Sequence, residues 1–440
     1  MRTKKYQFIV GGLLKLVSWT LLLTPSCYAA DKLKVLHRFT GANGSTPLAG
    51  LVFDTAGNLY GTTTYGGDLS CSGYGGAGCG TVFKLSKDPD GTWTESVLHK
   101  FSGADGVMPE AGLIFDAAGN LYGTTSYGGS SSNCVGYPGC GTVFKLSPNS
   151  NGSWTESVLY SFKGEVGDLF YDGQFPRAGL IFDAAGNLYG TTVLGGDSTC
   201  GQFAGGCGSV FKLTANSGGS WTESLLYSFN GSDGQYPSSR LIFDPDGNLY
   251  GTTQGGSGTT GYGAVVFKLA PNSDGSWSES VLHAFSGLSD GEVPLAGLIL
   301  DATGSLYGTA EQGGIQTCAG GYGGCGLVFK LTQKPDGSWK KTALHMFAGK
   351  PVGDPASDLI FDAAGNIYGT AWGRTNGAVF KMTPGTDGRW AYSILKVFDG
   401  EPGLQPTAPL VLDNAGNLYG TTSACGPEKG CDGVVFEITP

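Results

Sequence analysis

Hydrophobic and polar positions alternate along the chain in short runs that repeat. The apolar run Leu51-Val52-Phe53 ends at Asp54, and a second run starts at Leu59-Tyr60 after a turn that contains Gly57-Asn58. Glycine and asparagine accept positive φ, and an aspartate can accept hydrogen bonds from nearby backbone amides. The pattern therefore predicts a β-hairpin. Seven copies begin at Asp54, Asp116, Asp183, Asp244, Asp301, Asp362 and Asp413.

Each repeat contains more than this hairpin. In the first repeat a third strand is expected over 80–85, a polar turn over 87–91 and a fourth strand over 93–101. Successive key aspartates are 51 to 67 positions apart. Units of four antiparallel strands at this period are typical of β-propeller blades, whereas a β-helix coil is much shorter.

The two ends of the chain indicate how the array closes. The last repeat stops at its third strand, 434–438, and lacks the fourth strand that carries a tryptophan in the other repeats. The segment Leu33–Phe39 matches Glu95–Phe101 of a fourth strand. An open solenoid would need capping repeats, whereas a closed ring leaves no exposed strand edges. The fold class predicted for residues 31–440 is an all-β, seven-bladed β-propeller whose last blade is completed by the N-terminal strand.

These repeats resemble a known family. Leu-Ile-Phe-Asp-Ala-Ala-Gly-Asn-Leu-Tyr-Gly-Thr-Thr at 180–192, and Gly-Thr-Val-Phe-Lys-Leu at 80–85, look like the GloVer tandem-repeat family of exported bacterial proteins. The resemblance covers residues 33–440. It implies a surface-associated repeat protein with variable C-terminal anchors, no assigned activity and no catalytic residues to transfer.

The N-terminus reads as an export signal over residues 1–30. Basic residues at 2, 4, 5 and 15 accompany a short apolar stretch, 16–23, and small residues follow at 27–29. This arrangement predicts a cleaved secretory signal peptide, since the apolar stretch is too short for a membrane span. Cys27 offers the rival interpretation of a lipoprotein anchor, which Thr24-Pro25 fit poorly. The expected location is secreted, cell-surface or periplasmic.

Charge narrows the range of partners. Without residues 1–30, 22 basic residues stand against 36 acidic ones, a net charge of −14. Such a chain repels nucleic acid and anionic membrane surfaces. We expect no nucleic-acid partner, no transmembrane segment, no cofactor and a monomeric state.

Ten cysteines form five close pairs in the loops between second and third strands. The pairs are Cys71/Cys79, Cys134/Cys140, Cys200/Cys207, Cys318/Cys325 and Cys425/Cys431. Repeats four and six lack both members, as a pairwise bond predicts. Zinc is the rival, but its usual ligand spacings are absent and no histidine lies nearby. An exported chain therefore favours five local disulfides and no metal.

The four histidines carry no obvious site. His37, His99, His283 and His345 occupy the same fourth-strand position in different repeats. Fourth strands are outermost in a propeller, so these side chains are expected to be far apart. They are not expected to share a metal ion or an active centre.

The innermost strands suggest a candidate ligand site. Four repeats begin this strand with Ala-Gly, whereas repeat four has Ser239-Arg240 and repeat six has Ser357-Asp358. Arg240 and Asp358 are thus predicted near the mouth of the central channel, where they would grip a polar ligand. The alternative is that they are solvated or bond to loop carbonyls. Neighbouring candidates are Arg177, Glu311, Trp372 and Arg374.

The long irregular loops on one face point to binding, because variable loops on a repeated scaffold usually carry it. Aromatic residues in these loops would stack on sugars or peptides, or fold down against the glycine-rich loops. The favoured function is a non-enzymatic binding module for a glycan or protein. The alternative is an extracellular hydrolase or lyase with its site at the channel mouth, and a structural envelope role is a third hypothesis.

Overall fold

The structure is a computed structural model of the chain. It describes residues 32–71, 78–132, 134, 139–164, 170–197, 200, 205–255, 263–315, 323–349, 352–373, 376–398, 400–401, 403–425 and 430–439. The pattern of contacts along the chain defines a compact unit over Asp31–Pro440, distinct from Met1–Ala30. The predicted signal peptide and Cys27 lie outside the described residues. In the ranges given above, no helix has both the length and the apolar character needed to cross a membrane.

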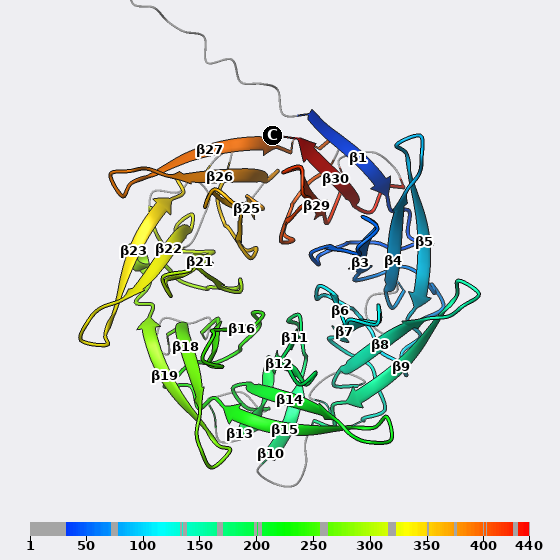
Figure 1. Ribbon diagram of the computed structural model, residues 1–440, viewed down its shortest axis with the longest axis horizontal. Coiled ribbons are helices and arrows are strands. Elements are labelled where there is room, and N and C mark those ends of the chain that lie inside the picture. Colours follow the sequence, from blue (N-terminus) through cyan, green and yellow to red (C-terminus); the bar gives the residue numbers. More distant parts are fainter. Residues whose placement is uncertain are drawn as a thin grey trace, which may run out of the picture. The chain divides into compact units, whose positions relative to one another are not determined.

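Seven four-stranded antiparallel sheets stand around a ring, which confirms the predicted all-β, seven-bladed propeller (Figure 1). From the innermost strand outward, blade 1 consists of β2 (Val52–Phe53), β3 (Leu59–Thr63), β4 (Thr81–Lys87) and β5 (Trp93–Lys100). Blade 2 consists of β6 (Ile114–Phe115), β7 (Leu121–Thr125), β8 (Thr142–Pro148) and β9 (Trp154–Ser161). Blade 3 consists of β11 (Ile181–Phe182), β12 (Leu188–Thr192), β14 (Ser209–Ala215) and β15 (Trp221–Ser228). Blade 4 consists of β16 (Ile242–Phe243), β17 (Leu249–Thr252), β18 (Val265–Pro271) and β19 (Trp277–Ala284). Blade 5 consists of β20 (Ile299–Leu300), β21 (Leu306–Ala310), β22 (Leu327–Gln333) and β23 (Trp339–Met346). Blade 6 consists of β24 (Ile360–Phe361), β25 (Ile367–Ala371), β26 (Ala378–Pro384) and β27 (Trp390–Val397). Blade 7 is β28 (Val411–Leu412), β29 (Leu418–Thr422), β30 (Val434–Thr439) and β1 (Lys32–Arg38).

Two short features lie outside this scheme. β10 (Phe170–Gln174) pairs with β13 (Leu194–Asp197) in an additional two-stranded sheet, and Leu288–Asp290 form a 3-10 turn. The sequence pattern did not predict either one, because both lie in loops that differ from blade to blade.

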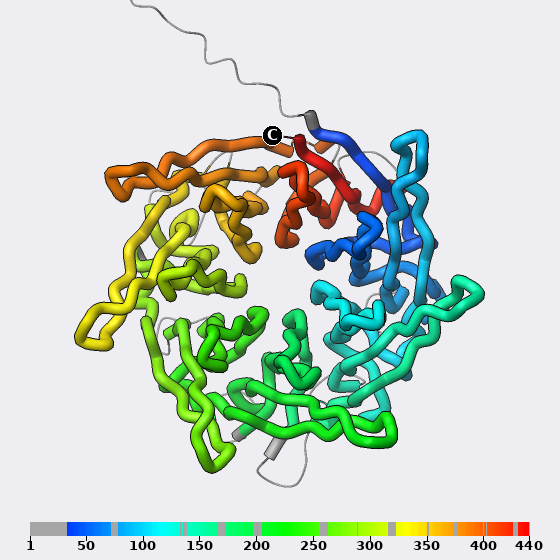
Figure 2. The backbone as a smooth tube through the Cα atoms, viewed as in Figure 1, coloured from blue at the N-terminus to red at the C-terminus, as the bar shows by residue number. Residues whose placement is uncertain are grey.

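The predicted closure of the ring is confirmed. The first strand, β1, pairs with the last, β30, as the outer strand of blade 7 (Figure 2). Its register skips Leu36 between Val35 and His37, and β5 skips the equivalent Leu98 where it pairs with β4. β1 therefore reproduces the fourth strand of the other blades, including its bulge.

The repeated aspartate organises each hairpin turn. Oδ1 of Asp54 accepts hydrogen bonds from the N–H groups of Ala56 and Asn58, and Oδ2 accepts from the Asn58 amide and the Tyr60 hydroxyl. Burial alone raises the pKa of this carboxyl, but these hydrogen bonds hold the pKa below its usual value. The tyrosine hydroxyl donates to the aspartate in all seven repeats, so this motif builds the fold.

Phenylalanines form the contacts between blades. The phenylalanine that follows each outer strand meets a phenylalanine of the next blade's third strand, for example Phe101 with Phe144, with ring centroids 5.1 Å apart. Phe39 and Phe83 make the same contact, at 5.0 Å, between blades 7 and 1. The fourth-strand tryptophans also pack between blades, for example Trp154 on Tyr60.

A strained residue before a proline connects each pair of blades, which the sequence pattern did not predict. Met108 has a φ of +58°; its N–H donates to the Cys79 carbonyl of blade 1, and its own carbonyl accepts from Ser126 N–H of blade 2. Left-handed backbone is costly for non-glycine residues, so tertiary contacts must hold it. The positions with this φ, from 54° to 59°, are Thr46, Met108, Phe175, Tyr236, Val293, Asp354 and Gln405.

The proline after six of the seven strained residues packs on a glycine of the preceding blade. Gly80→Ala is therefore expected to destabilise the protein. A Cβ at Gly80 would lie 2.5 Å from Pro109 Cδ, and the φ of Gly80 is +97°. Gly57→Ala is the matched control, since its φ is +83° but its Cβ would meet no atom within 4 Å. We expect a loss of about 1 kcal/mol for Gly57→Ala and about 2–4 kcal/mol for Gly80→Ala by chemical denaturation. Equal losses would mean that backbone strain alone matters.

Candidate functional site

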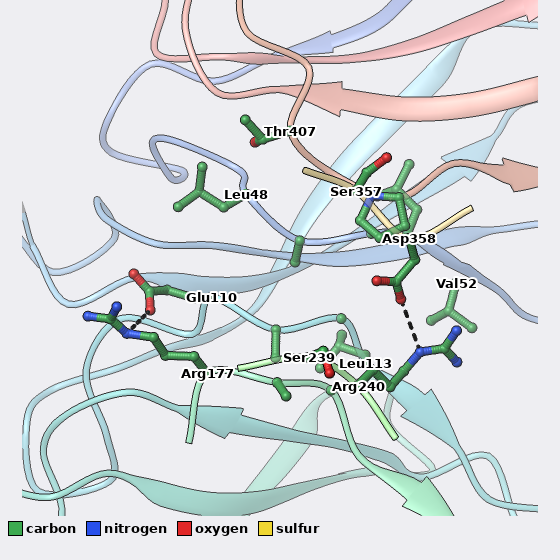
Figure 3. A pocket seen from close by; sticks show the side chains of 18 of the residues that line it. Leu48, Val52, Glu110, Leu113, Arg177, Ser239, Arg240, Ser357, Asp358 and Thr407 are labelled. Atoms are coloured by element: carbon green, nitrogen blue, oxygen red, sulfur yellow. Dashed lines mark hydrogen bonds and ion pairs between the residues drawn. The ribbon is translucent and has the colours of Figure 1, made fainter. Parts of the chain in front are cut away.

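The innermost strands surround a central cavity of about 410 Å³ (Figure 3). All seven blades contribute the residue directly after the proline described above. These residues are Leu48, Glu110, Arg177, Ser238, Leu295, Ala356 and Thr407. The volume lies in the range of small-molecule sites.

One part of the cavity wall is apolar. The first residue of every innermost strand is Val or Ile, and four of these residues line the cavity: Val52, Ile114, Ile360 and Val411. The leucine before each of them is buried, as Leu51 shows. Val52, Ile114, Ile360 and Val411 are less buried than the leucines, so they give the cavity part of its apolar wall.

Arg240 and Asp358 lie in this cavity and contact each other. Arg240 Nε is 3.3 Å from Asp358 Oδ2, although the two residues come from blades 4 and 6 (Figure 3). The N–H of Gly297, in blade 5 between them, donates to Asp358 Oδ1 at 2.6 Å. A Cβ at Gly297 would lie 3.0 Å from both Arg240 O and Asp358 Oδ1. The absence of a side chain at this position of blade 5 therefore leaves room for the ion pair between blades 4 and 6. The two charges thus form one ion pair and do not face each other across the channel.

A second ion pair lies in the same cavity. Arg177 Nε is 3.3 Å from Glu110 Oε2, and Arg177 Nη2 donates to the Tyr127 hydroxyl at 3.1 Å. The Ser126 hydroxyl donates to Glu110 Oε2 at 2.5 Å. Glu110 was not among the predicted site residues. Its signal was available, because it stands in blade 2 where blades 1 and 5 carry leucine.

The other candidate residues do not join this group. Glu311 and Trp372 follow the second strands of blades 5 and 6, and neither is among the described residues that line the cavity. Their backbone N–H groups donate to the carbonyls of Val293 and Asp354 at the strained positions. Arg374 lies outside the described residues.

Several loop aromatics pack inward. Tyr127 and Phe175 are buried with ring centroids 4.9 Å apart, and Tyr65 packs against the same apolar cluster. For these three residues, the structure agrees with the expectation that aromatics fold down against the loops. Tyr74, Tyr137, Phe203, Tyr262 and Tyr322 lie outside the described residues.

Four local disulfides support the loops, as the cysteine pairs predicted. They join Cys71 to Cys79, Cys134 to Cys140, Cys200 to Cys207 and Cys425 to Cys431, with Cα atoms 5.3–5.7 Å apart. Cys325 is disulfide-bonded as well, whereas its predicted partner Cys318 lies outside the described residues. Disulfides persist in oxidising compartments, so this is an exported protein.

On the outer rim, a histidine and two carboxylates lie close together. The ligand-type atoms of His99, Asp105 and Glu156 are within 4.8 Å of one another. Asp105 Oδ2 contacts His99 Nε2, and its Oδ1 accepts from Ser102. Two equivalent junctions replace the histidine by a tyrosine that donates to an aspartate, namely Tyr160 to Asp172 and Tyr227 to Asp233. The cluster is therefore one version of a loop-fixing contact to an aspartate that recurs at other junctions with a tyrosine in place of the histidine.

Solved structures with similar folds differ widely in sequence. No curated protein matches the chain. An ancestral GH74 enzyme is 13% identical with a TM-score of 0.50, over 90% of this chain and 51% of that one. The PQQ-bound aldose sugar dehydrogenase of Streptomyces coelicolor is 12% identical with a TM-score of 0.43, over 93% and 98% of the chains. The extracellular domain of a putative one-component system from B. thetaiotaomicron is 12% identical with a TM-score of 0.49, over 93% and 41%. The chain thus spans about half of the GH74 enzyme and less than half of the one-component system protein. At 13% identity, the likeness to the GH74 enzyme shows the fold alone.

The repeat sequence itself shows the family. The model of the Gloeobacter/Verrucomicrobia repeat matches residues 24–203 and 69–319, which together make up more than half of the chain. This agrees with the resemblance carried by the hairpin motif and by the third strand of each blade. The chain belongs to the Gloeobacter/Verrucomicrobia repeat family.

Proposed function

We propose that this exported protein binds a small polar ligand, such as a short glycan, in its central cavity without transforming it. The observation that carries the proposal is a cavity of about 410 Å³ to which every blade contributes and in which the charged side chains are held in fixed pairs. Charged groups in a fixed orientation reduce the entropy lost on binding.

The same geometry favours binding over hydrolysis or elimination. Among the described residues that line the cavity there is no His, Cys, Lys or Tyr. Its two acids, Glu110 and Asp358, are each ion-paired with an arginine. A carboxylate that acts as a nucleophile or general base must be able to reach the substrate. A carboxylate paired with an arginine is already engaged. The hydrolase or lyase alternative therefore has less support.

The cavity is also a better candidate than the outer loops for the site of binding. Two of the described loop aromatics, Tyr127 and Phe175, are buried and thus unavailable for stacking on a glycan or protein. In the proposed function, a signal peptide over 1–30 directs export. The mature propeller then acts as a monomer outside the cytoplasm, where its disulfides are stable.

Filling the cavity is expected to abolish binding. Ala356 lines the cavity and is partly exposed, so Ala356→Trp adds an indole at the mouth with little effect on buried packing. Ala363→Trp, in an exposed turn of the same blade, is the control. Ligands from a saccharide and small-molecule panel that bind wild type by calorimetry should bind the control and fail to bind Ala356→Trp. NMR of the recovered ligand should show it unchanged.

Two results would oppose this proposal. Equal binding to Ala356→Trp and wild type would place the site outside the cavity. A ligand that is recovered cleaved or rearranged would favour the enzyme alternative.

A further inference from the structure

We infer that the cavity recognises an organic carboxylate and that Arg240 binds this group. The inference rests on the proposed function and adds the chemical class of the ligand. The ion pair with Asp358 leaves part of the Arg240 guanidinium unused.

Only one nitrogen of Arg240 is engaged in the structure. Nε contacts Asp358, whereas Nη1 and Nη2 make no hydrogen bond to any described residue, and 41% of the side chain is exposed. A guanidinium presents its donors as a planar fork that matches the two oxygens of a carboxylate. The unused end of Arg240 is therefore a receptor for a carboxylate in the cavity.

The support behind Arg240 is rigid. Only 14% of the Asp358 side chain is exposed, and Asp358 Oδ1 accepts from the N–H of Gly297. The Arg240 stem passes Gly179, where a Cβ would lie 3.5 Å from Arg240 Cδ. Arg240 is thus held before a ligand arrives, and a held donor loses less entropy on binding than a free one.

The surroundings limit the ligand to a small, singly charged acid. The chain without residues 1–30 has a net charge of −14, which repels polyanions. Val52, Ile114, Ile360 and Val411 give the cavity an apolar wall. A ligand with one carboxylate and a compact body fits both conditions. Either a sugar acid or an acid with an apolar ring meets this description.

Two matched pairs of probes test the inference and distinguish these sources. Glucuronate is compared with glucose, and benzoate with benzyl alcohol, by calorimetric or NMR titration up to tens of millimolar. We expect at least one acid to bind wild type about tenfold to one-hundredfold more tightly than its neutral partner, the usual effect of hydrogen bonds to a charged group. The pair that shows this preference identifies the body of the ligand.

Variants then assign the preference to Arg240. Arg240→Gln should remove the preference for the acid, and Arg240→Lys, which keeps the charge but not the fork, should weaken it. Arg389→Gln, which removes one positive charge from a side chain that is 90% exposed, should leave it unchanged. Arg240→Lys keeps the test valid if loss of the partner of Asp358 prevents Arg240→Gln from folding.

The outcomes separate this inference from the proposed function. Failure of both acids to bind, or equal binding of an acid to wild type and Arg240→Gln, overturns the assignment to Arg240. A neutral probe that binds better than its acid and is blocked by Ala356→Trp also overturns the carboxylate inference but leaves the cavity as the binding site. An acid that Arg240→Gln weakens and Ala356→Trp blocks supports both.

Discussion

A mature chain that lacks Leu33–Phe39 is expected to lose most of its stability. β1 is the only partner of the outer edge of β30 among the described strands. Its removal exposes that edge and uncovers the contact between Phe39 and Phe83 that joins blades 7 and 1. A loss above about 5 kcal/mol is expected, which is comparable to the whole stability of many proteins.

Single substitutions in the same segment give a quantitative check. Phe39 is fully buried, so Phe39→Ala should cost about 3–5 kcal/mol. Lys34→Ala, at an exposed position of β1, should change stability by about 0.5 kcal/mol or less. Urea denaturation of the two variants measures the difference.

A peptide tests closure directly. Residues 31–40 added in trans should bind the truncated chain and raise its melting temperature, because an extended peptide can restore the missing strand pairing. A scrambled peptide serves as the control. Our assignment of β1 would be contradicted if the truncated chain had the same melting temperature as the full mature chain and remained monomeric.

The triple variant Glu156→Gln/Glu223→Gln/Glu279→Gln is expected to be more stable than wild type at pH 8. The three glutamates lie at equivalent blade junctions, and one oxygen of each is buried without a hydrogen-bond partner among the described residues. Partial burial raises the pKa of each glutamate to about 7, and the charge of a neighbouring aspartate adds to this effect. Gln carries no charge to desolvate, and its amide can donate to the aspartate.

The sign of the pH dependence follows from these pKa values. Below the ordinary glutamate pKa of 4.5, the side chain is protonated in both the folded and the unfolded chain. Between that value and the folded pKa of about 7, the unfolded chain binds fewer protons, so wild-type stability falls as pH rises. The advantage of the variant should therefore appear across this window and remain constant above it.

The expected gain is about 1 kcal/mol per glutamate, or roughly 3 kcal/mol in total, after discounting for solvent access to half-buried groups. Melting curves at pH 4 and pH 8 measure it. Glu401→Gln, at an exposed position, is the control. The junction after blade 4 supports the expectation, since Lys341 occupies this position there and its Nζ is 2.9 Å from Asp290 Oδ1. A variant that is less stable than wild type at pH 8 would show that the carboxylates are needed.

The amino-acid sequence by itself determined the blade, the number of blades, the closing strand and the local disulfides. Each of these features depends on residues that are near in sequence or recur at a regular interval. Asp54 and Tyr60 are six positions apart, Cys134 and Cys140 likewise, and the match of Leu33–Phe39 to Glu95–Phe101 is visible as a repeat. Periodic hydrophobicity and turn chemistry therefore carry this information directly.

Only the tertiary structure decided how the site is built. The sequence placed Arg240 and Asp358 near the channel mouth, but their 118-residue separation holds no information about contact, which arises because the ring turns blades 4 and 6 toward each other across Gly297. Glu110 and Arg177 meet for the same reason. The glutamate pKa values and the left-handed residues before proline also depend on the neighbouring blade, since burial and long-range hydrogen bonds set both. Contacts between blades are therefore what the sequence pattern alone did not reveal.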